Sequence, residues 1–332
     1  MPCQLCGAEK IYSIQSHYAP KSITKETFGE SDKEEIYSIT PQTGEIEVYK
    51  GRQNPTAVEG DIKPLPNADR GIFCRRCEDA FGKLESICQP PLNDYLEDLE
   101  NLNFKPFRVK EQLKAFEIPI KSNIMLLFFY SVVWRLCLKN QFDVGNTVLS
   151  SDEYKFLQEI LLTELFKEVK QIESSDFSGY PRLSIFSSKL GGIRSGWVSV
   201  SPYQTNPELF FLGKYHILYF RNDKIVDKNI YSFLGIPSFI LNPNINLQPN
   251  INNSIIGVVP AHIHAGITQA LVRKTSDDMK LTFYTQVAKH RKINLNLASK
   301  LIHEKVVEIR KQNPDNNDKI SIMRQAVESL CS

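Results

Sequence analysis

The sequence lacks the features that would place it in several special classes. No apolar run reaches the roughly 18 uncharged residues that a membrane span needs, because the longest, Ile124 to Leu138, contains Arg135. The first residues have neither the basic start nor the apolar stretch of a secretory signal. No internal repeat recurs at a fixed period. We therefore expect a cytoplasmic protein that does not enter a membrane.

Neither sign of charge is in excess, since 40 Lys and Arg face 38 Asp and Glu, for a net charge of +2. The whole chain thus offers no electrostatic case for a polyanionic partner. The distribution is uneven, because residues 1–110 hold 14 basic and 18 acidic side chains, whereas residues 271–332 hold 12 and 7. Residues 289–292, all Lys, Arg or His, could contact phosphate, although a solvated helical face explains them equally well.

The composition is that of a folded protein: the chain has 332 residues, of which 42% are hydrophobic. At this length a core needs no disulfides. The patterns predict an α+β protein of three domains. Residues 1–90 are rich in turn formers, residues 91–175 are mainly helical, and residues 176–332 combine β-rich runs with terminal helices.

Individual elements follow from hydrophobic periodicity and turn signals. Helices are predicted from Cys74 to a stop at Pro90-Pro91, over 122–140, over 151–172, and from about Asn294 onward with an interruption near Pro314. Strands are predicted at 215–220, 236–241 and 255–259, with a short hairpin about Gly44. Ser150 and Glu153 have the spacing of a capping box at the start of the third helix.

Seven cysteines are too few and too unevenly placed for a disulfide scaffold in a chain without an export signal. Four of them form two C-x-x-C turns, Cys3 with Cys6 and Cys74 with Cys77. Each such turn brings two thiolates to one point, so two turns make a closed tetrahedral site for a structural Zn²⁺. The alternatives are four unrelated thiols, or a redox C-x-x-C, which would need a βαβ context that neither pair has.

The 67 residues between the two turns contain the motif Ser-His-Tyr-Ala-Pro-Lys at residues 16–21. A cysteine pair, this motif, and a second pair followed by Glu78 resemble the bacterial HNH-like proteins whose hallmark reads Ser-His-Ile-Ile-Pro-Lys. Those proteins are similar to the ββα-metal, or His-Me finger, nucleases built on treble clefs. Ser131-x-x-Trp-Arg135 resembles the segment that follows the finger, so the resemblance covers roughly residues 1–140.

Hydrolysis of a phosphodiester needs a base that activates water and a divalent cation that stabilises charge on the phosphate. The resemblance implies that His17 is the base, a role that suits a histidine, and that Asn67 orients it. Glu78 and Glu85, two turns apart on one predicted helix face, could jointly hold Mg²⁺ or Mn²⁺. HNH nucleases usually carry an acidic residue before the catalytic histidine, and this chain has Ser16 there.

Three basic residues are candidates for nucleic-acid contacts: Lys21, Arg75 and Arg76. The resemblance implies a metal-dependent endonuclease that acts on nucleic acid in bacterial defence against phage. DNA is favoured over RNA as the partner, a choice that the sequence itself leaves open. A homo-oligomer or a partner protein could complete the nucleic-acid surface of a nearly neutral chain. Arg135 is expected to lie over an aromatic ring or to pair with an acid inside the helical part.

Two other functions remain open. The first is a non-catalytic zinc finger that binds nucleic acid or a partner protein, and Ser16 is its best support. The second is a metalloenzyme acting on a small molecule through His262 and His264, which would share one face if their segment were a strand.

Overall fold

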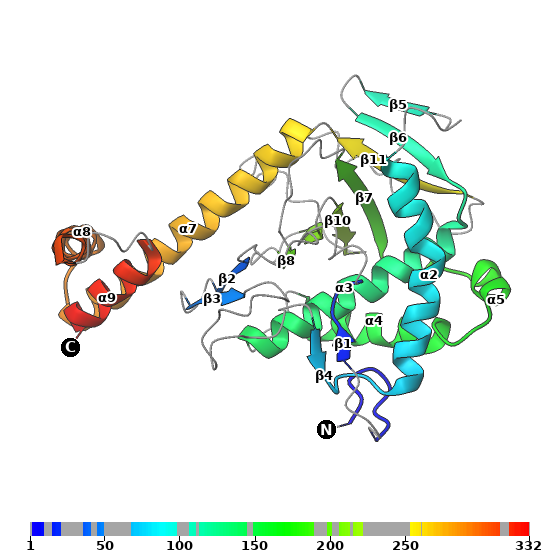
Figure 1. Cartoon of the computed structure of the whole chain (residues 1–332), viewed down its shortest axis with the longest axis horizontal. Coiled ribbons are helices and arrows are strands. Elements are labelled where there is room, and N and C mark those ends of the chain that lie inside the picture. The colour runs from blue at the N-terminus through cyan, green and yellow to red at the C-terminus, as the bar shows by residue number, and fades with distance from the viewer. Residues whose placement is uncertain are drawn as a thin grey trace, which may run out of the picture. The chain divides into compact units, whose positions relative to one another are not determined.

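The chain is an α+β protein, seen in a computed structural model (Figure 1). The structure describes residues 2–9, 15–20, 36–40, 45–49, 68–97, 106–110, 113–144, 149–188, 198–200, 206–212, 215–221, 253–259, 261–312 and 319–331. Two compact units can be distinguished. The first comprises Met1–Ile36 and Lys50–Thr268, and the second comprises Tyr37–Tyr49 and Gln269–Ser332.

A mixed sheet of seven described strands spans the first unit. In spatial order the strands are β5 (Pro106–Lys110), β6 (Leu113–Ile118), β11 (Ser254–Val259), β7 (Arg182–Ser188), β10 (Tyr215–Phe220), β9 (Glu208–Leu212) and β8 (Val198–Val200). Neighbouring strands are antiparallel except β11 and β7, which are parallel. Every residue of β10 is buried, His216 included, which explains why its sequence does not alternate between polar and apolar side chains.

The strands predicted at 215–220 and 255–259 are confirmed as β10 and β11. The strand predicted at 236–241 lies outside the described residues. Strands β5 and β6 were missed, because residues 106–118 fall in a segment predicted to be mainly helical. Strand β6 pairs with β11, which follows more than 130 residues later in the sequence, and a pairing of that range leaves no local pattern.

Helix α3 (Ser122–Val144) is the central element of the first unit, as predicted for residues 122–140. Its side chains from Ser122 to Leu138 are all buried. It packs against α2 (Arg75–Glu97), α4 (Ser151–Glu164) and α5 (Val169–Ser174) and also touches the sheet. In the described part of the chain, one helical window, Ser122–Lys139, is long and apolar enough to cross a membrane, and 94% of it is buried inside the protein.

One hydrophobic core joins all three predicted domains. Leu5 and Phe81 from residues 1–90, Phe128 from residues 91–175 and Ile185 from residues 176–332 belong to the same cluster of buried side chains. The boundaries of the compact units therefore differ from those of the predicted domains. The composition differs between the three segments of the sequence, but apolar side chains from all three pack into one core.

The predicted stop of the second-cysteine helix at Pro90-Pro91 is wrong, because α2 continues through both prolines to Glu97. A proline inside a helix removes one backbone hydrogen bond and crowds the preceding turn. Beyond the prolines, Leu92 is fully buried, and its carbonyl accepts a hydrogen bond of 2.7 Å from the Tyr215 hydroxyl. These contacts with the sheet favour continuation of the helix against its local propensity.

The second unit has its own helical core, formed by α7 from Gln269 to its end, α8 (Leu295–Gln312) and α9 (Lys319–Cys331). Helix α7 (Ala261–Arg291) begins in the first unit. It ends at Arg291, and the next residue, Lys292, has a left-handed φ of 56°. Helix α8 begins where the Asn294 side chain accepts from the Leu297 N–H. Strands β2 (Ile36–Thr40) and β3 (Glu45–Tyr49) pair on either side of Gly44, as the predicted hairpin requires.

The capping box of α4 is confirmed. The Ser150 hydroxyl accepts from the Glu153 N–H at 3.3 Å, and the Glu153 carboxylate accepts from the Ser150 N–H at 3.1 Å. Replacing Ser150 with Ala should lower the free energy of unfolding by about 1 kcal/mol, measured by urea denaturation. The matched control is Ser151→Ala, an exposed neighbour outside the capping box. Equal losses in the two variants would contradict the assignment.

Candidate metal centre

Four sulfur atoms meet near the N-terminus of the first unit. The distances between Sγ atoms are 3.8 Å for Cys3 and Cys77, 3.7 Å for Cys6 and Cys74, and 3.6 Å for Cys74 and Cys77. All four lie within 4.8 Å of one another and none forms a disulfide. A tetrahedron of sulfurs about 2.3 Å from a central zinc has edges of about 3.8 Å. This four-cysteine cluster could therefore hold a metal ion such as zinc.

Two local structures bring these thiols together. The first is a tight turn in which the Cys3 carbonyl accepts from the Gly7 N–H at 2.9 Å, and Gly7 has a φ of 73° that a side chain would disfavour. The second is the start of α2, where the Cys74 carbonyl accepts from the N–H groups of Cys77 and Glu78 at 3.1 Å each. The Cys74 N–H also donates to Cys3 Sγ at 3.2 Å, so the two turns contact each other directly.

The electrostatics of the cluster suit a cation. Burial alone would raise the pKa of the Cys3 thiol, but N–H groups of Cys6, Cys74 and Leu5 outweigh it and lower that pKa to about 7. Burial, together with the negative charge of Cys3, raises the pKa of Cys77. Thiolates are the form that binds metal, and a bound cation removes the repulsion between them. The residues present therefore fit a tetrahedral thiophilic ion.

The first turn is also fastened to α4. The Gln158 side-chain amide donates to the carbonyls of Gln4 and Leu5 at 3.0 and 2.8 Å. Cys3 and Cys77 belong to the main hydrophobic core rather than to a separate small one. The four-cysteine cluster is thus packed against the rest of the first unit and is not a separate module.

His17 lies close along the chain to this cluster, as the last residue of strand β1 (Gln15–His17). Strand β1 pairs antiparallel with β4 (Ala68–Arg70), with His17 opposite Ala68. The His17 side chain is partly buried, and its Nε2 atom is not exposed to solvent. The order in the first unit is therefore cysteine turn, strand with His17, second strand, second cysteine turn and helix.

Ser16 and Glu78 connect this strand to the start of α2. The buried Ser16 hydroxyl accepts from the Phe73 N–H at 3.2 Å and donates to the Glu78 carboxylate. Burial raises the pKa of Glu78, whereas Ser16 and the charge of Arg135 lower it. Glu78 Oε1 is buried and accepts no hydrogen bond from the described residues. Serine at the position before the histidine therefore has a structural role of its own.

Glu85 is engaged by Arg135, the buried cation at the centre of the unit. Arg135 Nη1 donates to Glu85 Oε1 at 2.8 Å and to the His17 carbonyl at 3.1 Å. Its Nε and Nη2 donate to Ser131, and its guanidinium lies 4.6 Å from the centre of the Phe81 ring. Both expectations for Arg135, an aromatic neighbour and an acidic partner, are confirmed. The sequence could not reveal that one of its acceptors is the backbone of His17.

Of the three residues predicted to contact nucleic acid, the structure describes Arg75 and Arg76. Lys21 lies outside the described residues, as does Asn67, the predicted orienting residue. Arg75 is exposed and pairs with Asp79 at 3.1 Å. Arg76 is also exposed, and its guanidinium lies 4.3 Å from the centre of the Phe166 ring. The two arginines therefore flank the cluster at the surface.

The strand proposed for His262 and His264 is wrong, because both residues lie in the first turn of helix α7. Positions two apart on a helix do not share a face. Within the described ranges, the four-cysteine cluster is the one group in which three or more potential metal ligands meet. Joint cation binding by Glu78 and Glu85 thus remains a prediction.

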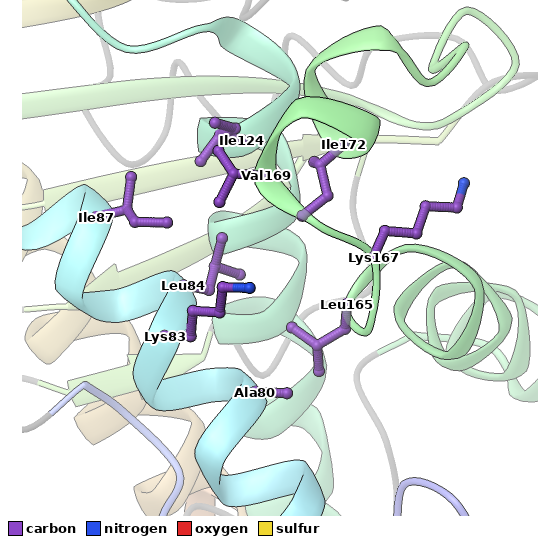
Figure 2. Close-up of a pocket in the computed structure, with 9 residues that line it drawn as sticks. All are labelled: Ala80, Lys83, Leu84, Ile87, Ile124, Leu165, Lys167, Val169 and Ile172. Atoms are coloured by element: carbon purple, nitrogen blue, oxygen red, sulfur yellow. The ribbon is translucent and has the colours of Figure 1, made fainter.

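An apolar pocket lies beside α2 (Figure 2). It encloses about 290 Å³, including space open to solvent, and is lined by Ala80, Lys83, Leu84, Ile87, Ile124, Leu165, Lys167, Val169 and Ile172. Its two lysines pair with carboxylates, Lys83 with Glu168 and Lys167 with Glu164. The lining offers no group for catalysis, so this pocket does not compete with the cysteine cluster as the functional site.

Comparisons with protein-family models, curated proteins and solved structures found no match for this chain.

Metal content tests the cluster directly. The purified protein should carry a single zinc ion per chain, measured by inductively coupled plasma mass spectrometry. Cys77→Ser should lose the metal and unfold the first unit, because a structural zinc contributes on the order of 10 kcal/mol to folding. Cys331→Ser, which removes a thiol of the second unit, is the matched control and should keep both. Full metal retention in Cys77→Ser would exclude the cluster as the site.

Proposed function

We propose that the chain is a metal-dependent nuclease of the HNH-like type, which hydrolyses phosphodiester bonds of nucleic acid. One observation carries the proposal: His17 ends strand β1 of the two-stranded β1–β4 sheet, and helix α2 follows β4 at the second cysteine turn. A cysteine turn, two antiparallel strands and a helix in this order are the parts of a treble-clef, or ββα-metal, finger. Zn²⁺ in the four-cysteine cluster would hold these parts together.

In this proposal the His17 imidazole accepts the proton of the attacking water. Glu78, at the start of α2, holds Mg²⁺ or Mn²⁺, which supplies positive charge for the phosphate when bound. The support for Glu78 is its buried, unbonded Oε1 oxygen. Glu85 is assigned to Arg135 rather than to the cation, because the two side chains form an ion pair of 2.8 Å.

The proposed substrate is a polyanion held in part by exposed arginines beside the cluster. Arg75 and Arg76 occupy the turn between Cys74 and Cys77, and both are exposed. Phosphate contacts of this kind position a nucleic acid without reading its sequence. DNA as the substrate, cytoplasmic location and a role in antiviral defence follow from the resemblance and form part of the proposal.

Cleavage assays test the assignment of His17. His17→Ala should lower the rate of plasmid cleavage in Mg²⁺ or Mn²⁺ by at least about 100-fold, the usual contribution of a general base, while zinc content stays unchanged. His303→Ala, which removes an exposed histidine of α8, is the control and should cleave normally. Equal rates for His17→Ala and the wild-type protein would remove His17 from the chemistry.

A non-catalytic zinc finger that binds nucleic acid or a partner protein is the second candidate. The Ser16–Glu78 hydrogen bond favours it, because it occupies the face of β1 where the resemblance expects an acidic metal ligand. Successive side chains of a strand point to opposite faces, which places His17 on the other one. Nucleic-acid binding without cleavage, unaffected by His17→Ala, would support this candidate.

A further inference from the structure

Arg135 is a buried charge whose hydrogen bonds reach three separate elements. Its side chain is 2% exposed. It donates to the His17 carbonyl in β1, to the Glu85 carboxylate in α2, and to the Ser131 carbonyl and hydroxyl in its own helix α3. The Phe81 ring of α2 covers the guanidinium. One side chain therefore joins the strand that ends at His17 to the two helices that flank it.

Stability alone does not account for such a pair. Taking two charges out of water costs several kcal/mol per ion, and replacing a buried ion pair with apolar side chains is often neutral or stabilising. Two apolar residues would fill the same space between α2 and α3. They could not donate a hydrogen bond to the carbonyl of His17. The bond to the strand is thus the feature that requires an arginine.

The geometry of the guanidinium makes this bond specific. Nη1 donates at once to Glu85 Oε1 at 2.8 Å and to the His17 carbonyl at 3.1 Å, while Nε and Nη2 are both used on Ser131. The planar fork of an arginine offers five donors in fixed directions, whereas a lysine ammonium is a point charge with three. A lysine carries its ammonium one bond closer to the backbone than Nη1, and it has no counterparts of Nε and Nη2 for Ser131, so it cannot reproduce these four bonds together.

Strand β1 needs this support because it is short. It has three residues and pairs with β4 in a two-stranded sheet, and such a pair has marginal stability by itself. Ser16 fixes the strand to the Phe73 N–H and to Glu78 through its side chain. Arg135 fixes the next peptide, that of His17, through its carbonyl. The backbone of His17, the proposed base, is therefore held by Arg135 of α3 as well as by the pairing of β1 with β4.

We propose that Arg135 and Glu85 form a positioning pair: the pair holds the His17 peptide in place and thereby orients the His17 side chain. Glu85 neutralises and aligns the guanidinium, and the guanidinium fixes the strand. The proposal rests on the proposed function for its kinetic effect, because the orientation of His17 affects a rate only if His17 takes part in the chemistry. Its structural effect on His17 is independent of that function.

The test replaces the pair with apolar side chains. The double variant Arg135→Met with Glu85→Leu removes both charges together, so that neither is left buried alone. It should retain zinc and the fold, but the His17 imidazole cross-peak should shift and broaden in NMR spectra of the histidine-labelled protein. The cleavage rate kcat should fall by about 100-fold with KM nearly unchanged, as for a displaced catalytic group. The cross-peak is assigned by its absence in His17→Gln.

A second buried pair of the same unit provides the matched control. Arg221 pairs with Glu208 at the end of β10, and both side chains are buried. The variant Arg221→Met with Glu208→Leu removes a buried ion pair whose neighbours include Glu153 and Asn206, both outside β1 and α2. This control should leave the His17 cross-peak and kcat at their wild-type values. A shift of equal size in the two double variants would reduce the effect to general loosening and overturn the proposal.

The single variant Arg135→Lys keeps the test decisive if the apolar pair does not fold. It retains a positive charge near Glu85, but its ammonium ends one bond short of the Nη1 position that bonds the His17 carbonyl, so the same cross-peak should shift although the fold is kept. An unchanged His17 cross-peak in a folded Arg135→Lys or double variant overturns the positioning role. A wild-type protein that cleaves neither DNA nor RNA refutes the nuclease proposal instead, and the cross-peak comparison still decides the role of Arg135.

Discussion

The convergence of four thiols is the constraint on which the N-terminal part of the structure depends. Two short turns, 67 residues apart in sequence, bring their sulfur atoms within 4.8 Å of one another. Thiolates at such distances repel one another, and a cation between them turns this repulsion into attraction. A metal bound there would hold the turn at Cys3 and the start of α2 at one point, and strands β1 and β4 lie between them along the chain. The position of His17 therefore depends on sulfur atoms that take no part in the proposed chemistry.

The sequence was informative wherever structure is determined over a few residues. The C-x-x-C spacing, the capping box at Ser150 and the apolar helix α3 each depend on neighbours within one or two turns, and each is confirmed. The sequence was uninformative where contacts with residues far away in the chain determine the secondary structure. Strand β6 forms beside the distant β11, and β5 pairs with β6 in turn. Helix α2 passes Pro90 and Pro91, and just beyond them Leu92 is buried and its carbonyl accepts a hydrogen bond from Tyr215.

The site shows the same division between local and distant information. Spacing predicted that Glu78 and Glu85 lie on one face of a helix, but it could not reveal that Ser16 would bond to the first and Arg135 to the second. Each of these partners comes from another element, and neither pairing leaves a periodic trace in the chain. The sequence suggests that the two carboxylates share a cation, but in the fold each one contacts a different neighbour.

The first cysteine turn depends on a hydrogen bond donor from a distant helix, the side-chain amide of Gln158 in α4. Small zinc modules are commonly regarded as portable, since the ion substitutes for a core and the module can be moved between proteins. Here a helix more than 150 residues downstream grips two carbonyls of the turn, and Cys3 and Cys77 are themselves part of the shared interior. An ion bound in this cluster and the surrounding protein would therefore stabilise each other. Residues 1–90 alone, or transferred to another protein, would lack the hydrogen bonds from Gln158 that help to hold the first cysteine turn.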